Sequence, residues 1–238
     1  MKLLRISLLA SVTLLSGILS FAQTADEIIA KYIDAIGGKD KISSIKSLYT
    51  ETSSQIMGNE APGTMTVLNG KGMIVETDFN GSKIIQCFTD KGGWATNPMA
   101  GMSTPQAMPE EQYKAGKAQL DIGGELFNYA TKGSKVTLVG KEGNLYNIKL
   151  IAKDSSVTNY FIDPATYYVS KMVKSGVIMD QQVEVTTTYS DYKKTDYGYT
   201  IPFTFQLEFG TMFSLTSTIK KIEINKEIDP KIFEMPKS

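Results

Sequence analysis

The chain has 238 residues but contains no histidine, one arginine (Arg5), one cysteine (Cys87) and one tryptophan. Without histidine, neither a Ser-His-Asp nor a Cys-His nucleophile system can form, and imidazole metal sites are excluded. Beyond Arg5 the chain lacks the bidentate guanidinium that grips phosphate or carboxylate. A single cysteine cannot form an internal disulfide, and its strand-like surroundings predict that Cys87 is buried as a small apolar residue. We expect no cofactor and no metal ion.

Carboxylates are the remaining source of catalytic groups, and paired carboxylates can hydrolyse glycosides. Glu110 and Glu111 are adjacent, so they point to different sides of a helix. Asp163 precedes a proline in a turn, where aspartate is common for backbone reasons. Together with Asp78, these side chains are expected to be solvated or to stabilise turns. The sequence therefore predicts a protein that is not an enzyme.

Residues 1–22 have the pattern of a secretory signal peptide: two basic residues, a mostly apolar run and the small-x-small motif Ser20-Phe21-Ala22. Cleavage is expected between Ala22 and Gln23. A bacterial lipoprotein needs a cysteine at the cleavage point, but Cys87 lies far downstream. The sequence therefore predicts export to the periplasm without a lipid anchor.

The same segment could instead stay attached as a membrane anchor. Its apolar run is interrupted by serine, threonine and glycine, and it falls short of the about 20 residues that a bilayer core requires, which favours cleavage. Cleavage removes two basic residues and leaves 23 against 25 acidic ones, a net charge of about −2. Nucleic acid is thus not an expected partner. Residues 23–238 contain no linker, repeat or low-complexity tract, so we expect one domain that does not span a membrane.

A helix is predicted directly after the cleavage point. Thr24 and Glu27 form a capping box, and Gly37-Gly38 supplies a stop signal. A short second helical turn is expected over residues 40–45. The apolar residues recur at helical spacing on one face: Ile28, Ile29, Tyr32, Ile33 and Ile36.

From Leu48 onward the apolar period changes to two, which is typical of strands with one apolar face. Short turns between successive strands predict an antiparallel meander, and a sheet of this many strands must curl around helices or a ligand. The expected strands cover residues 47–57, 63–69, 72–79, 82–89, 134–140, 144–152, 157–163, 167–174, 181–192 and 199–226, the last holding two strands.

Residues 97–129 interrupt this meander. Prolines and a glycine predict a loop over residues 97–109, and proline followed by acidic residues predicts a helix start near Pro109. Apolar residues including Leu126 and Phe127 follow. The segment has the pattern of a lid or a plug.

Several short segments, in order along the chain, resemble the periplasmic lipoprotein-carrier (Lol-type) superfamily, especially its outer membrane lipoprotein-sorting branch. They are Tyr32-Ile33-Asp34-Ala35-Ile36-Gly37-Gly38, Gly93-Trp94-Ala95-Thr96-Asn97-Pro98, Tyr160-Phe161-Ile162-Asp163, Tyr189-Ser190-Asp191-Tyr192, Gly198-Tyr199-Thr200-Ile201-Pro202, Ile224-Asn225 and Ile232-Phe233-Glu234-Met235-Pro236.

The resemblance implies a mainly β fold with helices (α+β): an incomplete, strongly curved antiparallel β-barrel wrapped around an N-terminal helix and a central helical lid. In that superfamily the cavity holds the acyl chains of a lipoprotein in transit. The well-known carrier holds its lid with an arginine at the cavity. The mature chain has no arginine, so neither that lid chemistry nor a lipoprotein cargo follows directly.

Eight residues are predicted to bind a ligand in the cavity or its lid: Trp94, Met99, Met102, Met108, Phe127, Phe203, Phe205 and Phe209. Thioether side chains repack readily, which suits a lid, but they could equally fill the open side of the sheet as core. Trp94 either edges the cavity mouth or makes an ordinary core contact.

The expected function is that of an exported, monomeric carrier whose partners are lipid or lipoprotein acyl chains and, as a further class, envelope membrane proteins. Two alternatives stay open. Three methionines could bind Cu(I) through sulfur. An exposed sheet edge could instead add a partner strand, with Lys220-Lys221 as a bulge or a charged edge guard.

Overall fold

The computed structural model describes residues 23–56, 58–178 and 181–236, so the predicted signal peptide and its cleavage point before Gln23 lie mostly outside the described residues. No helix in these ranges combines the length and apolar content needed to cross a bilayer. The helices are α1 (Ala25–Ala35), α2 (Lys39–Ser43) and α3 (Glu110–Lys117), with short 3-10 turns η1 (Pro98–Ala100), η2 (Ala118–Leu120), η3 (Tyr129–Lys132) and η4 (Pro230–Phe233).

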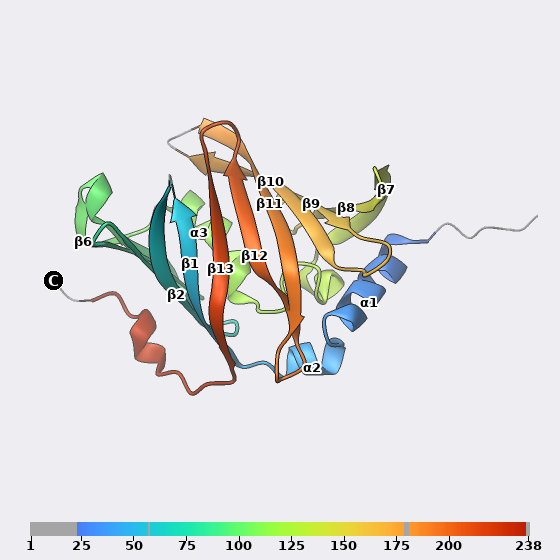
Figure 1. The fold of residues 1–238 in the computed structure, drawn as a ribbon, viewed down its shortest axis with the longest axis horizontal. Coiled ribbons are helices and arrows are strands. Elements are labelled where there is room, and N and C mark those ends of the chain that lie inside the picture. Colours follow the sequence, from blue (N-terminus) through green and yellow to red (C-terminus); the bar gives the residue numbers. More distant parts are fainter. Residues whose placement is uncertain (1–22, 57, 179–180, 237–238) are drawn as a thin grey trace, which may run out of the picture.

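Within the described residues, thirteen strands form one antiparallel sheet in the order β6-β5-β4-β3-β2-β1-β13-β12-β11-β10-β9-β8-β7. The edges β6 and β7 lie at opposite ends of the order, and Figure 1 shows them far apart. The predicted incomplete, curved antiparallel barrel with helices is confirmed. The strands are β1 (Ser47–Ile56), β2 (Asn59–Leu68), β3 (Gly72–Phe79), β4 (Ser82–Thr89), β5 (Gly93–Asn97), β6 (Met102–Ala107), β7 (Lys135–Glu142), β8 (Leu145–Ile151), β9 (Val157–Ile162), β10 (Val169–Ile178), β11 (Gln181–Lys194), β12 (Thr200–Phe209) and β13 (Phe213–Ile224).

The connection between the two edge strands, residues 108–134, is called here the crossing segment or the plug. It contains α3 and fills part of the concave side. Leu120 shares a core cluster with Phe88 of β4, whereas Leu126 shares one with Ile148 of β8. The crossing segment therefore packs against both halves of the sheet, as a plug does.

The N-terminal helix forms as its sequence predicts. The Thr24 hydroxyl accepts from the Glu27 N–H at 3.2 Å, and the Glu27 carboxylate accepts from the Thr24 N–H at 2.9 Å. Ile28 and Ile29 are buried on the face that meets the sheet. The predicted short second helix is confirmed as α2.

Strand β6 forms within residues 97–109, where the sequence predicted a loop. Pro105 was one of the loop signals, since proline cannot donate to a strand ladder. It is tolerated because β6 is an edge strand that pairs only with β5. The loop prediction was therefore wrong for Met102–Ala107.

Lys220 lies at a bulge, one of the two predictions for this position. The pairing of β1 with β13 passes from Glu51 opposite Lys221 to Thr52 opposite Ile219, which leaves Lys220 without a partner on β1. The alternative, a charged guard on an exposed edge, was wrong because β13 lies between β1 and β12. The bulge keeps the apolar residues of β13 on one face despite their broken alternation.

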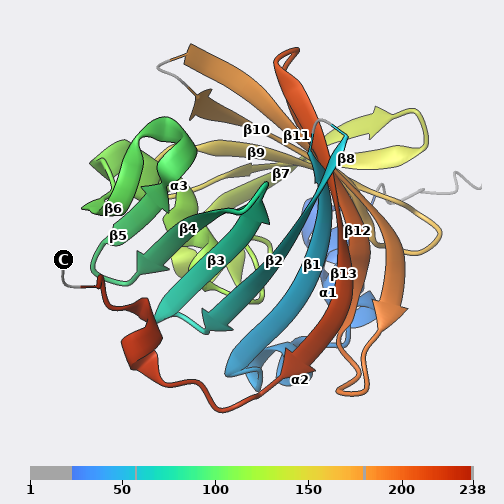
Figure 2. The same cartoon turned by 60° about the vertical axis from the view of Figure 1, so that its left-hand side comes forward.

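The C-terminal segment, residues 226–236, runs over the convex face of the sheet beside β3 and β4 (Figure 2). Phe233 is buried there with Cys87 and Trp94. The Trp94 indole N–H donates to the Phe233 carbonyl at 2.9 Å. Burial raises the pKa of the Cys87 thiol to about 12, which agrees with its predicted role as an apolar residue. A Cβ at Gly72 would lie 2.5 Å from the Phe233 ring, so this position requires glycine.

Phe233→Ala should lower the free energy of unfolding by about 3 kcal/mol, because a buried phenyl ring is lost and its site cannot fully collapse. Urea unfolding followed by Trp94 fluorescence measures the change. Ile232→Ala is the matched control, since the neighbouring side chain is 43% exposed and should contribute little. Equal destabilisation by the two variants would contradict this role of Phe233.

Candidate functional site

An apolar strip crosses the far ends of adjacent strands on the concave face. Ile56 pairs with Leu215, and Leu215 in turn pairs with Leu207. Phe209 pairs with Phe213, and their rings stack at 4.5 Å between centroids. We call this set the open strip, and its members are Ile56, Phe205, Leu207, Phe209, Phe213 and Leu215.

The strand alternation places the open strip on the same face as the plug. Leu48 shares a core cluster with Leu120 of the crossing segment, and Ile56 lies an even number of residues further along β1. Among the described residues, the four core clusters include no member of the strip. Phe213 is 40% exposed, and the other members are half-buried. Figure 1 shows the β12–β13 hairpin tip at the top, away from α1 and α2.

A belt of hydroxyl side chains adjoins the open strip. Ser217 and Thr187 are buried, and they lie directly opposite Phe205 and Leu207 in the sheet. The Ser54 hydroxyl donates to the Ser217 hydroxyl at 2.9 Å. The belt thus places buried polar groups in the same rows of the sheet as the apolar side chains of the strip.

Polar contacts hold the crossing segment in the concavity. The Glu125 carboxylate accepts from the Tyr160 hydroxyl at 2.6 Å and from the Thr158 hydroxyl at 3.0 Å. The Tyr199 hydroxyl donates to the Ile122 carbonyl at 3.2 Å. None of these contacts involves an arginine, and residues 23–238 contain none.

Several tyrosines surround this contact, and their phenols are kept neutral. Burial raises the pKa of Tyr189 and of Tyr199 to about 12 in each case. Burial, reinforced by the charge and hydrogen bond of Glu125, raises the pKa of Tyr160 well above 10. Burial likewise raises the pKa of Tyr32 on α1. A neutral phenol can donate to a carboxylate or a carbonyl, so the raised pKa values preserve the contacts of the plug.

The structure brings together only part of the predicted set of site residues. Phe205 and Phe209 lie on the open strip. Phe203 is half-buried, with the Lys193 ammonium 4.9 Å from its ring centroid. Phe127 is buried in the core cluster at the corner of α1 and α2. Trp94 lies on the convex face beneath the C-terminal segment and thus faces away from the strip.

The three methionines do not gather at one point. Met99 is 59% exposed in η1, Met102 begins β6, and Met108 follows its end and packs beside the cluster of Phe88. Met102 lies opposite Asn97 on β5, whereas Ala107, which precedes Met108, lies opposite Trp94. These two positions on β5 are three residues apart, about 10 Å along the strand. In the described ranges, no group of three His, Cys, Asp or Glu side chains could hold a metal.

The acidic residues considered for catalysis have structural contacts. The Asp78 carboxylate accepts from the Gly81 N–H at 2.9 Å, and the Asp163 carboxylate accepts from the Ala165 N–H at 2.7 Å. Both therefore stabilise turns. Glu110 forms an exposed ion pair with Lys114 at 2.9 Å.

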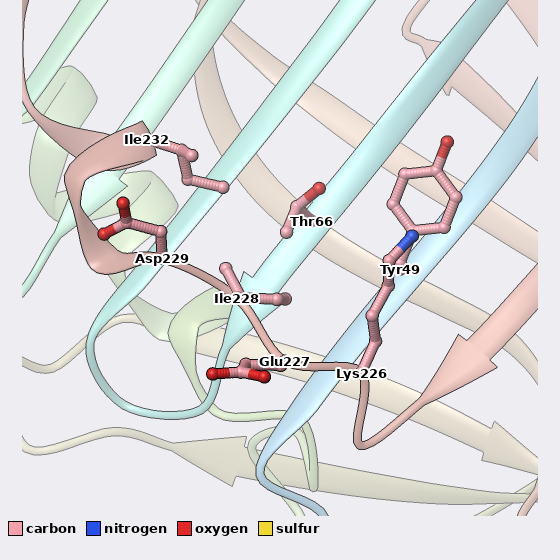
Figure 3. Close-up of a pocket in the computed structure, with 7 residues that line it drawn as sticks. All are labelled: Tyr49, Thr66, Lys226, Glu227, Ile228, Asp229 and Ile232. Carbon is pink, nitrogen blue, oxygen red and sulfur yellow. The ribbon is translucent and has the colours of Figure 1, made fainter.

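A separate cleft of about 230 Å³ lies on the convex face, between the C-terminal segment and strands β1 and β2 (Figure 3). The Lys226 ammonium in its wall pairs with Glu223 at 2.7 Å and lies 4.5 Å from the centroid of the Tyr49 ring. Its charge is thus already compensated within the protein.

Sequence reasoning missed part of this arrangement. Leu215 and Ile56 follow the strand period, which predicts their face but not whether another element covers it. Glu125 gave no signal, because its contacts on β9 are more than thirty residues away along the chain.

No family model matches the sequence, and no curated protein matches it. Solved structures do match, over 87–90% of this chain and 94–98% of theirs, at 12–13% identity. They are a LolA superfamily protein from Nitrosomonas europaea (TM-score 0.57), a DUF1329 family protein from Desulfovibrio piger (0.58) and a domain described as an outer membrane lipoprotein-sorting protein from Vibrio parahaemolyticus (0.56). The chain has the LolA-like fold. The family resemblance seen in the sequence is confirmed at the level of the fold.

Raised tyrosine pKa values predict a loss of stability in alkali. Folding favours the neutral phenol, so this stabilisation is complete below pH about 10, the ordinary tyrosine value, and is lost as the pH rises through about 12. Urea unfolding between pH 8 and 12, with tyrosinate absorbance recorded in parallel, measures the loss. Tyr189→Phe should flatten the dependence, because it removes one ionisable group. Ionisation of all tyrosines near pH 10 in the intact fold would contradict the prediction.

Proposed function

We propose that this protein is an exported, non-catalytic carrier that binds lipid-like cargo, such as the acyl chains of a lipid or lipoprotein, in the periplasm. The observation that carries the proposal is the open strip, an apolar part of the concave face outside the core clusters. Two matching structures, a LolA superfamily protein and an outer membrane lipoprotein-sorting domain, support this class of function.

The energetics favour acyl chains as cargo. Each buried methylene contributes about 0.8 kcal/mol, so a sixteen-carbon chain brings about 12 kcal/mol into play when it is fully covered. From Phe205 to Phe209 the strip extends about 13 Å, and the three strands β1, β13 and β12 that carry it span about 10 Å. A surface of this size covers one side of a chain and leaves the other exposed. Partial coverage suits a carrier that must also release its cargo.

The remaining parts of the proposal follow from the sequence. The signal-peptide pattern of residues 1–22 supports export, and the lack of a cysteine at Ala22-Gln23 supports a mature protein without an acyl anchor. We take residues 23–238 as one domain that acts as a monomer. The turn and surface contacts of Asp78, Asp163 and Glu110 support a role without catalysis.

Replacing Phe205 and Phe209 together by serine should weaken the uptake of a fluorescent fatty acid at least tenfold, because two half-buried rings of the strip are lost. Fluorescence titration of the purified mature protein measures the affinity, and thermal unfolding checks the fold. Gln206→Ser is the matched control, since this exposed side chain lies between them on the opposite face of β12.

Native mass spectrometry of protein purified from the periplasm provides a second test. Co-purifying acyl lipid or lipopeptide is the expected result. A clean mass without ligand, combined with no fatty-acid uptake by the unaltered protein, would overturn the proposed function.

A further inference from the structure

A second hollow, of about 420 Å³, opens where the corner between α1 and α2 meets the β11–β12 turn. In Figure 1 this region lies at the bottom of the molecule, around α2. Its wall contains Lys41 of α2 and Lys194 of β11, with Asp34 of α1 as the acidic side chain. Two ammonium groups against one carboxylate give the hollow a net positive charge.

Two glycines hold Lys41 in position. A Cβ at Gly198 would overlap the Lys41 ammonium, and a Cβ at Gly37 would lie 3.5 Å from Lys41 Cδ. Both glycines have positive φ values, +131° at Gly37 and +84° at Gly198, which other residues rarely adopt. The Lys41 side chain therefore packs against the backbone of two glycines, and its ammonium group lies along the wall of the hollow.

Neither lysine of the hollow is neutralised by the protein. Every ion pair in the described part of the chain uses other lysines. Neither ammonium group donates a hydrogen bond to another of the described residues. This differs from Lys226 in the cleft of the convex face, whose charge is paired with Glu223. Lys41 and Lys194 are thus available to an anionic ligand.

The other wall of the hollow is held together by a ring stack and hydrogen bonds. Tyr168 stacks on Tyr192 with ring centroids 4.3 Å apart and an angle of 11° between the planes. The Tyr192 hydroxyl donates to the Val169 carbonyl at 2.7 Å. The Thr200 N–H donates to the Ile36 carbonyl at 2.9 Å, which joins the two sides of the corner. The hollow is therefore built by contacts among α1, β10, β11 and β12.

We propose that this hollow binds a phosphate-bearing ligand, with Lys41 and Lys194 as its two cationic contacts. Lysine binds phosphate as a point charge, and without an arginine it supplies the cationic contacts available here. The site is distinct from the open strip. Thr200 at the hollow and Phe209 on the strip stand at opposite ends of β12, about 30 Å apart. The proposal therefore goes beyond the carrier function and does not depend on it.

The test is a titration of the mature protein with inorganic phosphate, glycerol phosphate and dihexanoyl phosphatidylglycerol below its micelle concentration, followed by amide chemical shifts. Saturable shifts at Gly37, Gly198 and Thr200 are expected. Lys41→Gln and Lys194→Gln should each weaken binding about tenfold, because each removes a charge-assisted hydrogen bond. Asp34→Asn should tighten it.

Lys39→Gln is the matched control, since Lys39 is exposed on α2 but does not line the hollow. Similar affinity for glycerol phosphate and the lipid would identify a soluble phosphate ester as the ligand. Binding of the lipid alone, weakened by Lys41→Gln, would identify a lipid headgroup. Absence of saturable shifts with all three probes, or equal weakening by Lys39→Gln, overturns the proposal. The Phe205 and Phe209 double variant should keep phosphate binding, so the two sites can fail separately.

Discussion

The two edges of the sheet, β6 and β7, are consecutive in the chain but lie at opposite ends of the strand order. The chain must therefore pass from one edge to the other, and residues 108–134 do so across the concave side. Its apolar side chains pack against both halves of the sheet, with Leu120 near Phe88 and Leu126 near Ile148. The plug is thus a consequence of the topology, and the location of the open strip follows from it.

The plug and α1 cover the lower part of the concavity, whereas the far ends of β1, β13 and β12 extend beyond them. Those ends keep an apolar inner face, from Ile56 through Leu215 to Leu207, because the strand alternation continues to the hairpin tip. In an ordinary core such side chains would be fully covered. Their partial exposure distinguishes the open strip from the filled interior around the plug.

The sequence predicted the features that depend on local pattern. The capping box of Thr24 and Glu27 and the strand periods involve neighbouring residues, and both are present. The bulge at Lys220 is one of the two alternatives that the broken alternation left open. Features that depend on distant contacts were not predictable. Trp94 lies on the convex face because Phe233, more than one hundred residues later, covers it there. Pro105 indicated a loop, yet proline is tolerated in an edge strand. Whether a strand lies at the edge depends on the whole sheet and not on the residues next to Pro105.

The absence of arginine has a structural counterpart in how the plug is held. An arginine would hold a lid by charge, and breaking its ion pair would leave a buried charge unpaired. Here neutral phenols do this work, since Tyr160 donates to Glu125 and Tyr199 donates to the Ile122 carbonyl. A water molecule can replace a neutral contact of this kind at small cost. Because burial keeps the tyrosine pKa values far above neutral pH, the phenols stay protonated and able to donate throughout the neutral range.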